Sequence, residues 1–96
     1  MIISIRTYVG CPNIAELNRR ARAKLLPVIR ELAGFQSIKL VELDENTVSF
    51  ITTFEAREQA EAANKQVQKI IQTELAQLVP TPAEVLLGDV LWETRW

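Results

Sequence analysis

The polar residues of the first predicted strand are the strongest candidates for chemistry in this sequence. Ser4, Arg6 and Tyr8 alternate with the isoleucines at positions 3 and 5. Side chains alternate across a strand, so these three share one face. A guanidinium beside a phenol can orient an anionic or phenolic oxygen by hydrogen bonding. We therefore expect this face to bind a small molecule that carries such an oxygen.

Three residues on other predicted elements join this candidate site. Trp92 would stack on a planar ring, and Asn64 would hydrogen-bond a substrate oxygen. A structural interpretation stays open, in which Arg6 pairs with Asp89 across a dimer and Trp92 anchors an interface. The candidate ligand-binding residues are Ser4, Arg6, Tyr8, Ser49, Asn64 and Trp92.

The composition excludes several kinds of catalysis. The 96 residues include no histidine and a single cysteine. The chain therefore offers no Ser-His-Asp or Cys-His catalysis, no histidine-ligated haem and no usual zinc site, and we expect neither a metal nor a cofactor. An oxygenase built from this chain would need a substrate that, once ionised to a phenolate, itself delivers the electron to oxygen. The protein would supply a dry pocket, orientation and hydrogen bonds.

Charge and hydropathy limit the partners. The net charge is −1, although residues 1–30 hold six basic groups and one acid. These basic groups fit either an anion-binding patch or a solvated helix face, and the spread of the arginines at 19, 20 and 22 around a helix favours the second. The near-zero net charge argues against a nucleic-acid partner, and no apolar run is long enough to suggest a membrane. A free cysteine without an export signal predicts a cytoplasmic protein.

The periodicity predicts six elements in one domain over residues 1–96. Period-two patterns predict strands over 2–8, 35–43, 47–53 and 85–92. Three- and four-residue spacing predicts two amphipathic helices between them, over about 14–33 and up to residue 78. The order is strand, helix, strand, strand, helix, strand. This is an α+β, ferredoxin-like βαββαβ fold, with a four-stranded antiparallel sheet and both helices on one face.

Local residues predict how the helices begin, bend and end. We expect Asn13 to cap the first helix, Pro27 to bend it and Gly34 to end it, with a buried stripe that includes Val28. Thr52 with a glutamate three residues later, or else Thr53, predicts the cap of the second helix. In the turn at residues 44–46, Asn46 can take a left-handed conformation.

Apolar residues on the sheet face away from the helices predict that the chain forms a homodimer. The side of the first strand that carries Ile3 and Ile5 is the more apolar, so we expect it to face the helices and leave Ser4, Arg6 and Tyr8 on the open face. The other strands have apolar residues on both faces, and a monomer would expose a large apolar patch. We predict a homodimer through the open sheet face and the last strand, in which two sheets enclose a space.

Two segments carry a resemblance to a known family. The helix start over residues 53–58, TFEARE, and the closing segment over 87–91, LGDVL, join the βαββαβ order. Together they resemble the antibiotic-biosynthesis-monooxygenase-like members of the dimeric α/β-barrel superfamily. The resemblance implies a dimeric α/β barrel with a pocket between sheet and helices in each protomer. The family includes cofactor-free oxygenases of phenols and quinols and haem-degrading enzymes. The haem-degrading branch binds haem through a histidine, which this chain lacks.

Two functions remain as hypotheses. The first is a homodimer that binds a planar aromatic or quinol-like molecule and oxidises it without a cofactor. The second is the same dimer as a non-catalytic ligand-binding or protein-interaction module. RNA-recognition modules share the element order, but they stack bases on aromatic residues of the first and third strands. Here the third-strand segment contributes one ring, Phe50, and the segment at residues 3–5 of the first strand contributes none, which disfavours RNA.

Overall fold

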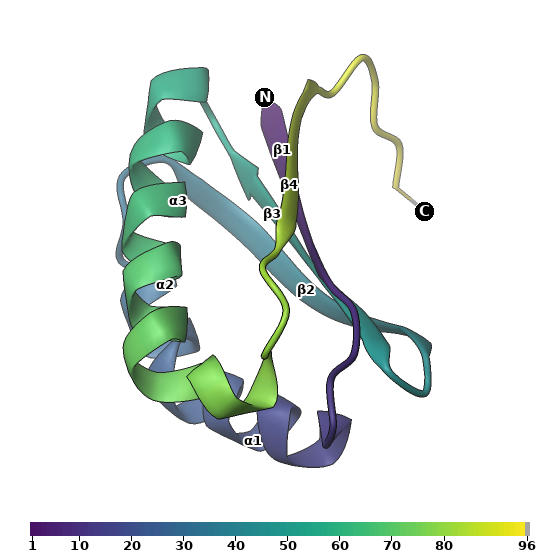
Figure 1. Ribbon diagram of the computed structural model, residues 1–96. Coiled ribbons are helices and arrows are strands. Elements are labelled where there is room, and N and C mark those ends of the chain that lie inside the picture. Colours follow the sequence, from purple (N-terminus) through teal and green to yellow (C-terminus); the bar gives the residue numbers. More distant parts are fainter. Residues whose placement is uncertain (96) are drawn as a thin grey trace.

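The protein folds as a four-stranded sheet covered by helices on one face (Figure 1). The computed structural model describes residues 1–95. All paired strands are antiparallel, in the order β2-β3-β1-β4, which confirms the predicted ferredoxin-like α+β arrangement. The elements are β1 (Ile2–Tyr8), α1 (Ile14–Lys24), α2 (Leu26–Ile29), β2 (Phe35–Asp44), β3 (Thr47–Phe54), α3 (Arg57–Ile70) and β4 (Glu84–Asp89).

The start of the first helical segment follows the sequence. The Asn13 side chain accepts a hydrogen bond from the Glu16 amide at 3.0 Å, which satisfies one of the free amides of the first turn. Helix α1 ends at Lys24, and Pro27 lies at the start of α2. The predicted bend is therefore a break between two helices, placed where the proline is tolerated.

The break changes which side chains are buried. The Val28 amide donates to the Leu25 carbonyl, three residues back, at 3.1 Å. This tightened turn brings Ile29 inward, with 1% of its surface exposed, and leaves Val28 39% exposed. The prediction that Val28 lies in the buried stripe was wrong, because it assumed one uninterrupted helix.

Helix α3 begins later than predicted. Thr52 and Thr53 belong to β3, and the Ala56 amide is capped by the side-chain oxygen of Gln59 at 3.0 Å. The predicted caps at Thr52 or Thr53 were therefore wrong. Gly34 lies against the Gln59 side chain with a φ of +77°, a conformation that glycine adopts without strain.

The remaining turns are simple. Helix α3 continues as a π-helical turn over Ile71–Leu75 and a short 3₁₀ turn over Ala76–Leu78, ahead of the prolines at 80 and 82. In the β2–β3 turn the Asp44 carboxylate accepts from the Asn46 amide at 2.8 Å. Within residues 1–95, positive φ values occur only at glycines, so the left-handed conformation expected for Asn46 was wrong.

The last strand is shorter than predicted. Strand β4 ends at Asp89, which is opposite Ile2, the first residue of its neighbour β1. Past this pair one more backbone hydrogen bond joins the two segments, from the Val90 amide to the Met1 carbonyl at 3.0 Å. The tail that follows bends away from the sheet on the side opposite the helices (Figure 1), and it leaves Leu91 90% and Trp92 79% exposed. The placement of Trp92 in the strand was wrong for this reason.

The core fills the space between the sheet and the helices. The largest fully buried side chains come from α1 and its extension, β3 and the end of the α3 segment, and they include Leu17, Leu25, Phe54 and Leu75. No helix within the described part of the chain combines the length and apolar character needed to cross a bilayer.

Candidate functional site

The polar residues of β1 face the helices. Ser4, Arg6 and Tyr8 are each at most 4% exposed, while Ile3 and Ile5 lie on the open face. The predicted face assignment was therefore wrong. It assumed that the inner face is the more apolar one, but helix α3 provides hydrogen-bonding partners that make burial of these polar groups affordable.

Arg6 is buried and is the centre of a hydrogen-bonded network that is buried on β1 and partly exposed on α3. Its Nη1 donates to the Tyr8 hydroxyl at 3.3 Å and to the Gln68 side-chain oxygen at 2.7 Å, and its Nη2 donates to the Asn64 carbonyl at 3.3 Å. The Ser4 hydroxyl donates to the Asn64 side-chain oxygen at 3.0 Å. We call these five residues the Arg6 cluster. Four of them, Ser4, Arg6, Tyr8 and Asn64, were expected to act together from the sequence.

The charge of Arg6 has no acidic partner in the described part of the chain. The ion pairs there involve Glu16, Asp89 and Glu93 with other arginines, and Asp89 pairs with Arg57 at 3.4 Å. Because Arg6 is buried inside the protomer, it does not reach Asp89 across a dimer. Its acceptors are neutral, which leaves a buried positive charge that is hydrogen-bonded but not neutralised.

Tyr8 gives a direct probe of this environment. Burial raises the pKa of Tyr8 above its ordinary value of 10.0, and the hydrogen bond and charge of Arg6 partly oppose this effect. The neutral phenol is thus favoured in the folded state. Its contribution to stability is complete below about pH 10 and is lost as the pH rises through the pKa of the folded protein.

We therefore expect the phenol of Tyr8 to ionise above pH 10.0 in the native protein and near that value in urea. Tyr8 is the only tyrosine, so the ultraviolet absorbance of tyrosinate follows it alone. The alkaline loss of unfolding free energy should be smaller in Tyr8→Phe. Ionisation of the native protein at or below the urea value would contradict the buried placement.

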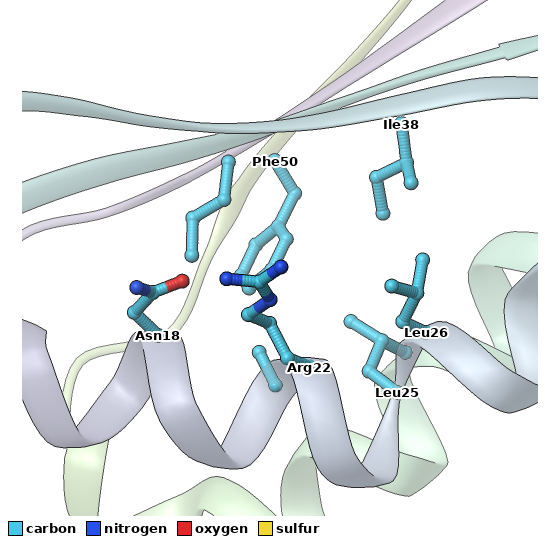
Figure 2. A pocket seen from close by; sticks show the side chains of 8 residues that line it. Asn18, Arg22, Leu25, Leu26, Ile38 and Phe50 are labelled. Atoms are coloured by element: carbon cyan, nitrogen blue, oxygen red, sulfur yellow. The ribbon is translucent and has the colours of Figure 1, made fainter.

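A cavity of about 230 Å³ lies between α1, α2 and the sheet. We call it the helix–sheet cavity. Asn18 and Arg22 reach from α1 toward the sheet, Leu25 and Leu26 lie beside them, and Phe50 and Ile38 project from the sheet (Figure 2). The apolar wall comprises Ala21, Leu25, Leu26, Ile38, Leu40 and Phe50. The cavity is thus apolar with two polar side chains.

Leu25, Ile38 and Phe50 lie between this cavity and the Arg6 cluster. They line both the helix–sheet cavity and a second, inner cavity of about 10 Å³, which Ser4, Arg6 and Asn64 also line. This volume is about enough for one water molecule. The Arg6 cluster therefore lies behind the apolar wall and not in the open part of the site.

The other two predicted residues lie elsewhere. Ser49 is on the open face, 2.7 Å from the Thr7 hydroxyl. Trp92 borders a groove of about 500 Å³ on the open face, together with Lys39 and Ile51. The structure therefore brings four of the six predicted residues together and places Ser49 and Trp92 on the opposite side of the sheet.

Sequence reasoning missed the residues of the helix–sheet cavity on α1. Asn18 and Arg22 are four residues apart, so they share a helix face, and Leu25 and Leu26 follow one turn later. Their shared face was the available signal. It was overlooked because the arginines of this helix were assigned to solvent as a group.

Sequence comparisons found no relatives: no family model matches the chain, and no curated protein does. Solved structures do match. A protein of unknown function from Nitrosomonas europaea has a TM-score of 0.79 at 14% identity, covering 98% of this chain and 92% of its own. A proposed antibiotic biosynthesis monooxygenase from the same organism has 0.73 at 14%, covering 96% and 100%. A mutant of MhuD, with two manganese protoporphyrin IX molecules bound per active site, has 0.75 at 16%, covering 100% of both chains.

At this level of identity the likeness concerns the fold. It spans nearly the whole length of each chain and agrees with the predicted resemblance. The chain has the ferredoxin-like fold of the antibiotic-biosynthesis-monooxygenase-like proteins.

Proposed function

We propose that this protein is a homodimer that binds a planar aromatic or quinol-like molecule in the helix–sheet cavity of each protomer and oxidises it without a cofactor. The observation that supports this most is the cavity itself. Its volume of about 230 Å³ is slightly below the range for drug-sized ligands, roughly 300–1,000 Å³, and suits one or two fused rings. The unpaired cysteine fits a reducing compartment, so we place the protein in the cytoplasm.

The chemistry assigned to the cavity relies on the substrate. The apolar wall excludes water and holds the ring, and the guanidinium of Arg22 stabilises an ionised oxygen. The quinol anion passes an electron to O₂, and the two radicals join at a ring carbon that carries hydrogen. The peroxide anion so formed takes up a proton, which balances the one that the quinol lost on ionising, and the hydroperoxide then loses water as its O–O bond breaks. One quinol and one O₂ give one hydroxyquinone and one water.

The Arg6 cluster forms the inner polar end of the proposed site. Ser4, Arg6, Tyr8 and Asn64 stay candidate ligand-binding residues, reached when a ligand displaces the ring of Phe50. We assign Trp92 to the dimer interface instead, because it is exposed on the other face of the sheet. Ser49 belongs to that face too, but it is buried and bonded to Thr7, so we assign it a structural role. The fold of the oxygenase-like neighbours supports the reaction class by analogy.

Blocking the cavity tests the site. In Asn18→Trp, an indole on the exposed face of α1 would fill the mouth of the cavity with little cost to the fold. Ala23→Trp, an exposed position on the same helix outside the cavity lining, is the matched control. We expect the wild type and Ala23→Trp to consume one O₂ per quinol, measured with an oxygen electrode, and Asn18→Trp to show only the background rate.

The outcomes separate the hypotheses. A quinol that binds without oxygen uptake, and is released unchanged, would contradict catalysis and support the non-catalytic ligand-binding module. Absence of binding by every quinol and aromatic tested would contradict the site altogether. Equal activity in both tryptophan variants would place the reaction outside the cavity.

The open sheet face supports the dimer. Ile3, Ile5 and Ile51 are only half-buried there, and Leu86 on β4 is 55% exposed. The exposed Trp92 borders the groove on the same face. A second copy, related by a two-fold axis, would cover this apolar surface with the same surface of its own.

A charge on this face should dissociate the dimer. Ile51→Lys places an ammonium next to Ile5, its partner on β1, and burial of an unpaired charge is costly. We expect light scattering to report a monomer for Ile51→Lys and a dimer for the wild type. Val28→Lys, the same change on the helix layer, should stay dimeric. A monomeric wild type at micromolar concentration would contradict the proposal.

A further inference from the structure

The charged side chains that line the helix–sheet cavity and the inner cavity are all positive. Arg22 lines the first and Arg6 the second, and neither cavity has an aspartate or glutamate among its lining residues. The remaining polar groups are neutral amides and hydroxyls. Any molecule that enters therefore meets positive charge and no negative charge, which favours an anion.

Arg22 is the cation that an entering ligand meets first. Arg19 and Arg20, on the same helix, both bind the Glu16 carboxylate. Arg22 has no ion pair within residues 1–95, and its side chain extends over the cavity toward the sheet (Figure 2). Arg22 is exposed, so water partly screens its charge, but the apolar wall on one side strengthens its attraction for an anion relative to a guanidinium fully surrounded by water.

Arg6 is less suited than Arg22 to make the first contact with an entering anion. Its guanidinium already donates to three neutral acceptors, and no buried side-chain nitrogen or oxygen of the described residues lacks a partner. The space beside it is about 10 Å³, too small for a carboxylate group. Selection by charge therefore falls to Arg22.

We propose that the ligand of the helix–sheet cavity is an aromatic carboxylate whose ring lies against Phe50 and whose carboxylate binds Arg22. This rests on the proposed function and names the substrate class. A phenol with a pKa of about 10 reaches the water-exposed mouth mostly protonated and gains a charge only after Arg22 has stabilised its phenolate, so it is the weaker ligand for first recognition. A carboxylate is ionised at neutral pH, and its two oxygens match the paired donors of a guanidinium.

A matched pair of ligands tests the charge alone. 2-Naphthoate and 2-naphthamide have nearly the same shape, and only the first is an anion. We expect calorimetric titration of the wild type to show naphthoate binding about tenfold more tightly than naphthamide. The preference should fall to about twofold or less in Arg22→Gln. Lys24→Gln, which removes a charge from the same helix outside the cavity lining, should keep the preference of the wild type.

Each outcome has a distinct meaning. Equal binding of the two ligands by the wild type, blocked in Asn18→Trp, would overturn the anion preference while leaving the proposed aromatic site intact. A preference that persists in Arg22→Gln would overturn the role of Arg22. Failure of both ligands to bind would contradict the proposed function as well. Circular dichroism of each variant confirms that the substitution leaves the fold in place.

Discussion

Replacing Phe50 with alanine is expected to lower the free energy of unfolding by about 4 kcal/mol, within the range for buried aromatic residues. Phe50 is 4% exposed and packs edge-on against Tyr8 with ring centroids 6.3 Å apart. Its loss leaves a void that the strands cannot close, because residues on both sides belong to the same sheet. Urea denaturation measures the change, and a loss below about 1 kcal/mol would contradict tight packing at this position.

The same variant should also enlarge the binding site. Without the Phe50 ring, the helix–sheet cavity and the inner cavity join, and the guanidinium of Arg6 lines the combined space. We expect 2-anthroate, with three fused rings, to gain affinity relative to 2-naphthoate. Phe35→Ala is the control, because Phe35 packs against Phe54 but lines neither cavity. If the ratio of the 2-anthroate affinity to the 2-naphthoate affinity is the same in Phe50→Ala as in the wild type, Phe50 does not divide the two cavities.

Replacing Arg6 with alanine is expected to cost about 3 kcal/mol of unfolding free energy. The substitution leaves the Gln68 side-chain oxygen and the Asn64 carbonyl without their donor and creates a void under α3. Arg6→Met should cost less, about 1 kcal/mol, because methionine refills the space and removes a buried charge that no carboxylate neutralises.

The comparison separates packing from charge. Equal destabilisation by Arg6→Met and Arg6→Ala would contradict the expectation that methionine costs less. It would mean that α3 is held on the sheet by the hydrogen bonds of Arg6 and not by the volume of its side chain. Arg57→Ala provides the reference for an exposed arginine, since its pair with Asp89 lies in solvent. Its effect should stay within about 1 kcal/mol.

The element order could be predicted because local signals and tertiary structure agree. Alternation in β1 and β3, the Asn13 cap and the breaks around Pro27 and Pro80 each depend on residues close in sequence. The amphipathic character of the second helix could be predicted for the same reason: Ala60, Ala63 and Val67 are spaced by three or four residues and are all buried on α3. No distant partner was needed to place them.

The face of β1 could not be predicted from apolar content. Period-two patterning fixed which residues share a side, but the choice of side depended on partners more than fifty residues away. Asn64 accepts hydrogen bonds from Ser4 and Arg6, and Gln68 accepts one from Arg6. A strand with a polar inner face looks solvent-exposed until the helix that satisfies it is in place.

The helix–sheet cavity was missed for a related reason. Its wall combines α1 with β2 and β3, and only the packed structure shows that the exposed Arg22 side chain also lines a cavity with Phe50 and Leu40. The end of β4 likewise depends on where β1 begins. Trp92 was placed in a strand because its neighbours are apolar, although Ile2 is opposite Asp89 and β1 extends no further.

The binding site is tested most directly by a crystal structure of the protein with 2-naphthoate. We expect the rings to lie in the cavity between α1 and the sheet, against Phe50, with the carboxylate within hydrogen-bonding distance of the Arg22 guanidinium. Naphthoate found only on the open sheet face or in the groove beside Trp92, with the helix–sheet cavity empty, would contradict the proposal.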